Sequence, residues 1–166
     1  MGIWQQIGSD IDGEKIDDQS GSSVSISSDG SIVAIGAPNN SGNGVWSGHV
    51  RVYQNNNGVW TQLGSDIDGK SGKVYTGHSI SLSRDGKFVA ISTEYGLVRI
   101  FQNNNSSWQQ IGSDINEINT GGTCISLSSD GSVVAIGYRH IDYGRRSGLV
   151  RIFQNNNGSW QQIGSD

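Results

Sequence analysis

The histidines and the single cysteine are the side chains in this sequence best suited to acid–base or nucleophilic chemistry. They are His49, His78, His140 and Cys124. A catalytic triad or a metal site needs such groups in a recognisable arrangement with acids or further ligands. The three histidines fall at different points of the repeating sequence described below, and no Ser-His-Asp or metal-ligand spacing can be recognised. The sequence therefore predicts that the protein is not an enzyme and uses no metal and no cofactor.

Two acidic stretches resemble the start of a calcium loop. Residues 10–14 (Asp-Ile-Asp-Gly-Glu) and 66–69 (Asp-Ile-Asp-Gly) concentrate carboxylates, and Ca²⁺ is bound by several convergent oxygens. The EF-hand pattern fails, however, and the third copy, residues 114–117 (Asp-Ile-Asn-Glu), has fewer acids. We interpret these carboxylates as loop and turn residues.

An arginine recurs at the same point of every repeat, as Arg51, Arg99 and Arg151. A residue that recurs in this way answers a need common to all repeats, which favours a structural role over a ligand-binding one. A guanidinium buried between packed units needs a carboxylate partner. The recurring candidates are the aspartates of the Gly-Ser-Asp blocks, Asp10, Asp66 and Asp114.

Internal repetition organises the whole chain. The block Trp-x-Gln-(Ile/Leu)-Gly-Ser-Asp begins at Trp4, Trp60, Trp108 and Trp160 and separates three similar units. Repeats of this length are typical of propellers and related arrays. Each unit contains an Asp-Gly pair between alternating apolar residues, which predicts a tight hairpin turn. A second alternating stretch follows, with Asn-rich residues before the next Trp, so each unit is expected to hold four antiparallel strands.

The expected fold class is all-β, with three four-stranded antiparallel β-propeller blades in a single domain spanning residues 1–166. The blades are expected at 20–64, 76–112 and 121–164, with an extra N-terminal strand at 3–8. Apolar side chains on both faces of the strands favour sheets covered on both sides, as in a propeller. A β-trefoil, which also has three four-stranded units, is the alternative.

The first unit resembles an FG-GAP repeat, the blade of integrin-type propellers. The resemblance lies in Ser20-Gly21-Ser22-Ser23-Val24, in Ile32–Pro38 with its Gly-Ala-Pro, and in Ser47–Tyr53. The other two units lack Gly-Ala-Pro, and the Phe-Gly position of the family is altered in all three. The resemblance implies a binding or adhesion module with an extracellular or cell-surface location.

The units differ mainly in two sets of loops, which a propeller places on one face. Binding residues often lie on variable loops carried by a rigid scaffold. We therefore predict a non-catalytic module that binds a glycan through this face, with a protein–protein scaffold or a fragment of a larger propeller as the alternative. The candidate ligand-binding residues are aromatic or multi-donor side chains: Trp46, Tyr95, Tyr138, Arg139, His140, Tyr143, Arg145 and Arg146.

Three blades are too few for a ring, since propellers close with about four to eight. Two copies would supply six blades, so a homodimer is the expected partner arrangement. The identical outer-strand sequences at 4–10 and 160–166 would then compete for similar places.

The charge balance argues against two other classes of partner. Charged residues make up 16% of the chain and its net charge is −4, which gives no basic surface for nucleic acid. No stretch approaches the length of apolar sequence that spans a bilayer. We expect no nucleic-acid partner and no membrane insertion.

Overall fold

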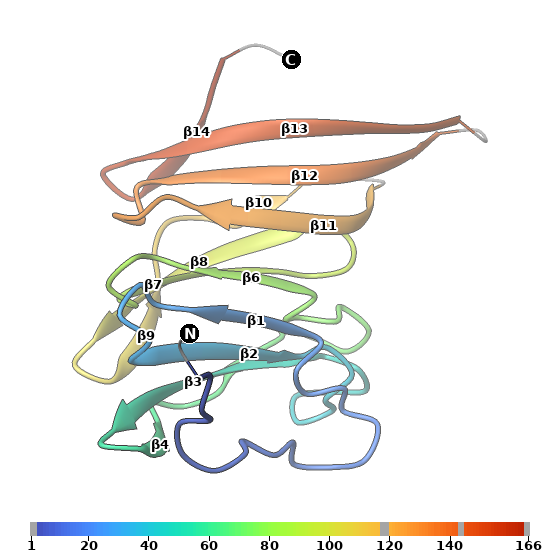
Figure 1. Ribbon diagram of the computed structural model, residues 1–166. Helices are drawn as coiled ribbons and strands as arrows, with labels where there is room; N and C mark the ends of the chain where they lie inside the picture. The colour runs from blue at the N-terminus through green and yellow to red at the C-terminus, as the bar shows by residue number, and fades with distance from the viewer. Residues whose placement is uncertain (1–2, 117–119, 143–144, 165–166) are drawn as a thin grey trace.

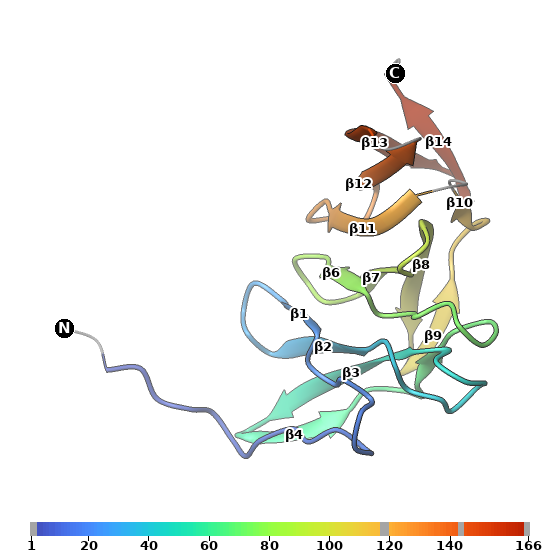
Figure 2. The same cartoon turned by 90° about the vertical axis from the view of Figure 1, so that its right-hand side faces the viewer.

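The chain folds as three antiparallel β-sheets that stack on one another in chain order and spread like a fan (Figures 1 and 2). The computed structural model describes residues 3–116, 120–142 and 145–164. Among the described residues, no helix has the length and apolar character needed to cross a membrane. The prediction of an all-β protein built from three repeated units is confirmed.

The first sheet has the order β1-β2-β3-β4, with a short fifth strand beside β3. Its strands are β1 (Ser23–Ile26), β2 (Ile32–Ala37), β3 (His49–Asn56), β4 (Val59–Gln62) and β5 (Ile67–Asp68). The second sheet repeats this plan with β6 (Ser79–Leu82), β7 (Phe88–Ser92), β8 (Leu97–Asn104), β9 (Ser107–Gln110) and β10 (Ile115–Asn116). The third sheet contains β11 (Thr120–Leu127), β12 (Val133–Asp142), β13 (Arg145–Asn156) and β14 (Ser159–Ile163).

The prediction of three four-stranded blades in a ring completed by oligomerisation is wrong for the single chain in two respects. The first two sheets have five strands, because the outer position beside the long third strand is shared by two short ones: β4 pairs with residues 53–56 of β3, and β5 with residues 49–50. Gly64, with φ 81°, lies in the turn that separates the two. The described part of the single chain forms no closed propeller, since three sheets leave the first and the last with one open face each (Figure 2).

Two further expectations need correction. Residues 3–8, expected to form an extra strand, pair with no described strand. The chain end projects from the body of the protein (Figure 2), and the segment contacts the body at Ile7, whose carbonyl accepts a hydrogen bond from Trp60. Residues 138–148 of the third unit are among the variable loops that the sequence predicts, but most of them form the ends of β12 and β13, which pair as far as Asp142 and Arg145. The main-chain amides and carbonyls of these residues are thus paired in an extended hairpin and do not lie in a loop.

The predicted Asp-Gly hairpin turns are confirmed, and side chains fix them. Gly30, Gly86 and Gly131 have φ between 69° and 74°, a conformation that glycine adopts without steric cost. In the first turn the carboxylate of Asp29 accepts hydrogen bonds from the hydroxyl of Ser27 and from the amide of Ser31. These bonds lower the pKa of Asp29 to about 2, so the turn keeps its acceptor well into the acid range.

Two apolar cores hold the sheets together. Ala34, Val50 and Val52 of the first sheet pack against Ile80, Leu82, Val89 and Ile91 of the second. Ala90, Val98 and Ile100, on the other side of the second sheet, pack against the third, through Leu127, Val134, Ile136 and Phe153. Both faces of the second sheet are thus buried, and stability depends on packing between sheets.

We predict that Ile91→Ala destabilises the protein by about 2–5 kcal/mol, because the side chain is fully buried between two sheets and leaves a cavity that rigid strands cannot fill. Urea unfolding monitored by tryptophan fluorescence measures this change. Val59→Ala, at an exposed position of β4, is the matched control and should shift stability by less than about 0.5 kcal/mol. Equal losses in the two variants would contradict the assigned core.

Candidate functional site

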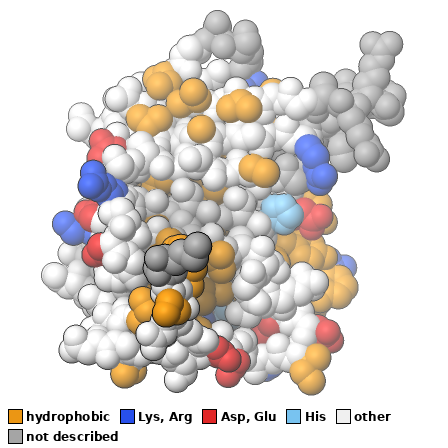
Figure 3. Space-filling model, viewed as in Figure 1, with side chains coloured by type: hydrophobic (Ala, Val, Ile, Leu, Met, Phe, Trp, Pro, Cys, Tyr) orange, Lys and Arg blue, Asp and Glu red, His pale blue; other side chains and the backbone are white. Residues whose placement is uncertain are grey.

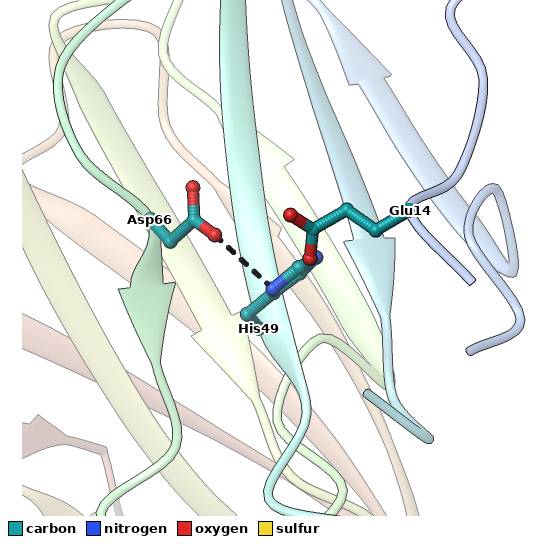
Figure 4. Close-up of side chains that lie close together, drawn as sticks. All are labelled: Glu14, His49 and Asp66. Carbon is teal, nitrogen blue, oxygen red and sulfur yellow. Dashed lines mark ion pairs between the residues drawn. The ribbon is translucent and has the colours of Figure 1, made fainter. Parts of the chain in front are cut away.

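A cluster of four charged or ionisable side chains lies at one end of the first sheet. His49 and Arg51 project from the same face of β3, Asp66 lies in the turn between β4 and β5, and Glu14 comes from the segment that precedes β1. Figure 4 shows the carboxylates of Glu14 and Asp66 on either side of the His49 ring. Segments that are distant in the sequence therefore supply the cluster together.

Arg51 is the centre of the ion pairs. Its Nε and one terminal nitrogen lie 3.0 Å from the two oxygens of Asp66, the bidentate geometry that makes such pairs strong. The same terminal nitrogen also contacts Glu14, and Gln62 donates a further hydrogen bond of 2.7 Å to Asp66. The predicted pairing of a repeated arginine with the Gly-Ser-Asp aspartate is confirmed here.

In the second repeat, the corresponding arginine has different partners. Arg99 donates to the main-chain carbonyl of Asp68 at 2.8 Å and lies 5.2 Å from the centre of the Phe101 ring. Asp114, which corresponds to Asp66, is paired with Lys70 instead. Lys70 occupies the position that Glu14 holds one repeat earlier, so the acidic surroundings of Arg51 differ from those of Arg99.

His49 is the residue that distinguishes the cluster chemically. It is only 4% exposed, and its Nδ1 lies 3.4 Å from Asp66 Oδ2. Burial lowers the pKa of His49 below its ordinary value, although Asp66 acts in the opposite direction. The ring is therefore neutral at pH 7, as a general base must be. The corresponding positions of the other repeats hold Leu97 and Leu149, so the sheet itself does not require a histidine.

Both carboxylates of the cluster are ionised at neutral pH. A hydrogen bond from Arg51 lowers the pKa of Glu14. Burial acts to raise the pKa of Asp66, but the hydrogen bonds from Arg51 and Gln62 outweigh it and leave this pKa below its ordinary value. The cluster thus combines two anions, one guanidinium cation and a neutral imidazole.

The cluster also has the composition of a metal site. Glu14, His49 and Asp66 can each offer one ligand atom, and these atoms lie within 4.8 Å of one another. The guanidinium of Arg51, however, already engages both oxygens of Asp66 and contacts Glu14. A divalent cation would have to displace that positive charge, so the arrangement favours proton chemistry over metal binding.

A small hollow adjoins the cluster on the face of the first sheet that no other described sheet covers. It is lined by residues of the N-terminal segment and of β2 and β3, including Asp12, Asp18, Ser20, Ile35, His49 and Tyr53. The hollow has room for about one water molecule, which would meet His49, Arg51 and Glu14 together.

Two predicted ligand-binding residues come together elsewhere on the surface. Trp46 and Tyr95 belong to loops of the first and second repeats, and the ring of Tyr75 joins them. Its centre lies 6.0 Å from that of Trp46 in a stacked arrangement and 5.9 Å from that of Tyr95 in an edge-on one. Sequence reasoning missed Tyr75, because it lies in a loop that has no counterpart pattern in the other repeats.

The other predicted ligand-binding residues do not form a described site with this pair. Tyr138 is 2% exposed and belongs to the core between the second and third sheets, so its assignment to a ligand-binding surface is corrected: its alternation along β12 turns it inward. Arg139 is exposed on β12. Tyr143 lies outside the described residues, as do the side chains of His140, Arg145 and Arg146.

The sequence did contain a signal for the cluster that prediction did not use. His49 breaks a repeat position otherwise filled by leucine, and Glu14 breaks one filled by Lys70 in the next repeat. Departures from a repeat at two positions that the fold brings together indicate a local role. Their proximity could not be inferred without the course of the N-terminal segment.

No family model matches this sequence, and no curated protein matches it. The fold, by contrast, resembles many solved structures. One is a Bacteroides uniformis protein named provisionally as a 6-phosphogluconolactonase, with a TM-score of 0.61 and 20% identity over 86% of this chain and 39% of that one. Another is Saccharomyces cerevisiae Sqt1, with a TM-score of 0.60 and 16% identity over 91% and 36% of the two chains.

A third is the periplasmic gluconolactonase PpgL of Pseudomonas aeruginosa, with a TM-score of 0.53 and 18% identity over 85% of this chain and 38% of that one. The chain thus spans less than two fifths of the length of each of these proteins. At such identities the likeness shows the fold alone: propeller-like sheets of an all-β protein.

Two sequence-based expectations are overturned by these neighbours. A non-catalytic glycan-binding or adhesion module, with a scaffold as its alternative, was expected, together with the absence of enzymatic activity. Two of the three similar structures carry the names of lactonases, so the fold gives no ground for excluding catalysis. The expectation relied on a recognisable spacing in the sequence, whereas this fold brings ionisable side chains together from separate segments.

We predict that Arg51→Ala destabilises the protein by about 1–3 kcal/mol, because it leaves the half-buried carboxylate of Asp66, and the exposed one of Glu14, without their cation. Urea unfolding measures the loss. Lys87→Ala removes a longer, exposed pair with Asp85 and should change stability by less than about 0.5 kcal/mol. A neutral Arg51→Ala would contradict the structural role of the repeated arginine.

We further predict that acid destabilises the protein through His49. Since the folded-state pKa of His49 lies below its unfolded value of 6.5, its contribution to stability is complete above that value and is lost as the pH falls below it. The melting temperature should therefore fall more between about pH 7.5 and 5.5 in the parent than in His49→Leu. Equal falls in the two proteins would contradict a buried neutral histidine.

Proposed function

We propose that the chain carries a hydrolytic site in which His49 is the general base and a cyclic ester of a polyhydroxy acid is the substrate. The observation that carries this proposal is a buried, neutral histidine held against a carboxylate at a position where the other repeats have leucine. The names of two fold neighbours, a gluconolactonase and a 6-phosphogluconolactonase, support the substrate class.

Each residue has a definite role in this reaction. Asp66 Oδ2 lies 3.4 Å from Nδ1 of His49, and its negative charge favours the tautomer with the proton on Nδ1, whose Nε2 can accept a proton. A water molecule attacks the carbonyl carbon of the lactone and gives its proton to Nε2. The carbon–oxygen bond of the ring then breaks, the ring oxygen takes the proton back from His49, and the product is an open-chain hydroxy acid.

Arg51 provides the electrostatic part of the site. It is charged throughout the accessible pH range: burial acts to lower the pKa of Arg51, but its hydrogen bonds with Asp66 and Glu14 outweigh burial and raise this pKa. A fixed cation beside the attacked carbonyl stabilises the oxyanion that forms in the transition state. Asp66 and Glu14 hold the guanidinium in place through the ion pairs described above, which makes them positioning residues.

The test is hydrolysis of glucono-δ-lactone, followed with a pH indicator against the spontaneous rate. We predict that the parent protein accelerates hydrolysis and that His49→Leu reduces the rate at least about 100-fold, the usual contribution of a general base. Leucine is the residue that the other repeats place here, so the variant is expected to keep the fold, which thermal melting checks.

His78→Leu is the matched control, since it removes an exposed histidine outside the cluster and should leave the rate unchanged. Acceleration that survives His49→Leu would contradict the role of His49. A parent protein that fails to exceed the spontaneous rate would contradict the proposed activity itself.

A further inference from the structure

Each sheet has two different faces, and at both junctions between neighbouring sheets the same two kinds of face meet. In the second sheet, the leading face is the one formed by Ile80, Leu82, Val89 and Ile91. In the first sheet, the trailing face is the one formed by Ala34, Val50 and Val52. The corresponding faces of the other sheets have the same names. The trailing face of the first sheet packs on the leading face of the second, and the trailing face of the second on the leading face of the third. The chain thus forms the same contact twice.

The same two faces are left open at the ends of the stack. Val24 and Ile26, on the leading face of the first sheet, are 63% and 59% exposed, whereas their counterparts Ile80 and Leu82 are 7% and 8% exposed. No sheet of the described chain covers them.

The trailing face of the third sheet shows the same contrast. Val150 and Ile152 are 70% and 40% exposed, whereas Val50 and Val52, which correspond to them, are buried. Hydrophobic side chains are accordingly visible over the third sheet at the top of the space-filling view (Figure 3). The molecule therefore exposes both halves of a contact that it makes twice internally.

Hydrogen bonds between sheets repeat in the same register. The amide of Leu82 donates to the hydroxyl of Ser25 across the first junction, and the amide of Leu127 donates to that of Ser81 across the second, both at 2.9 Å. In a third junction of this kind, the donor would be Ile26 of the first sheet and the acceptor Ser126 of the third. Both stand at the open ends of the stack.

We propose that the trailing face of the third sheet binds the leading face of the first sheet of a second copy, head to tail. The hollow beside His49 opens on this same face, so the second copy would border it. Two such contacts close two copies into a ring of six sheets, within the usual range for propellers. The occupant of each open face is another copy of this chain, because the complementary surface, its side chains and its hydrogen-bond register already occur in the same molecule.

The N-terminal segment already stands where a preceding sheet would have its outer strand. The indole of Trp60 donates to the carbonyl of Ile7 at 2.9 Å. The same bond joins Trp108 to Leu63 and Trp160 to Ile111, in each case from one outer strand to that of the preceding repeat. Residues 4–8 therefore occupy the outer-strand position of a sheet that this chain lacks.

In the ring, the sheet that precedes the first sheet is the third sheet of the other copy. Residues 4–10 and 160–166 have the same sequence, so only one of them can lie beside β13. We infer that residues 4–8 of one copy replace β14 of the other. This exchange explains why Trp4 is fully exposed in the single chain: its indole would donate to Ile111 of the second copy.

We predict a mass of about 35 kDa by light scattering for the parent protein, twice the 17.7 kDa of one chain. Val24→Asp and Val150→Asp each place a charge in the contact and should give folded monomers, with folding checked by circular dichroism. Val59→Asp is the matched control: the valine is 64% exposed, and the other repeats have Ser107 and Ser159 there, so the dimer should persist. A monomeric parent protein overturns the proposal.

Cys124 reports whether the contact is head to tail. It is exposed on the trailing face of the third sheet, so its thiol should react with a maleimide at least about tenfold more slowly in the dimer than in Val24→Asp, although that change lies in the first sheet. If Val24→Asp leaves the reaction rate of Cys124 unchanged, the dimer joins other faces and the proposal is overturned. Neither mass nor thiol reactivity depends on hydrolytic activity.

The two matching tryptophans distinguish which segment completes the third sheet. Trp4→Ala should raise the dissociation constant of the dimer at least about tenfold, and Trp160→Ala should leave it within about twofold. The opposite result would show that β14 keeps its place and would overturn the exchange of the N-terminal segment.

Discussion

The requirement that each sheet bury both faces governs this structure. Ala34, Val50 and Val52 on one face of the first sheet and Val24 and Ile26 on the other make both faces apolar, so a single sheet cannot bury all of its apolar side chains. Stacking buries both faces of the second sheet and one face of each outer sheet. Burying an aliphatic side chain contributes about 1.5–3 kcal/mol, and the open faces retain several such side chains. The physical constraint that builds the fold thus also makes a single chain incomplete.

Polar residues adapt to the same arrangement. The repeated arginines emerge on the leading faces, where a cation between sheets must find acceptors. Arg99 uses a main-chain carbonyl and an aromatic ring, whereas Arg51 uses two carboxylates. The second arrangement concentrates charge next to His49, and burial keeps that histidine neutral. The same repeated arginine therefore has a carbonyl and an aromatic ring as partners in the second repeat, and two carboxylates beside a histidine in the first.

The outer edge of the sheets shows how local backbone rules modify a repeat. Gly64 and its counterpart Gly112 adopt φ of 81° and 70°, and they divide the outer position into two short strands in the first two sheets. Added side chains at Gly64 or Gly112 would collide with the backbone of the next repeat at 2.7 Å or less. The same close approach lets the tryptophan of one outer strand reach the carbonyl of the previous one. Neighbouring repeats are therefore joined at their edges as well as at their faces.

The sequence by itself determined the repeats, the hairpin turns, the antiparallel strands and the pairing of Arg51 with a Gly-Ser-Asp aspartate. These follow from local patterns: alternation, Asp-Gly turns and the recurrence of a charge. Only the tertiary structure decided that β5 and β10 add a fifth strand, that Tyr138 points inward, and that Glu14, His49 and Asp66 converge. Convergence depends on where the N-terminal segment crosses the first sheet, and that course is set by long-range packing, which no local pattern records.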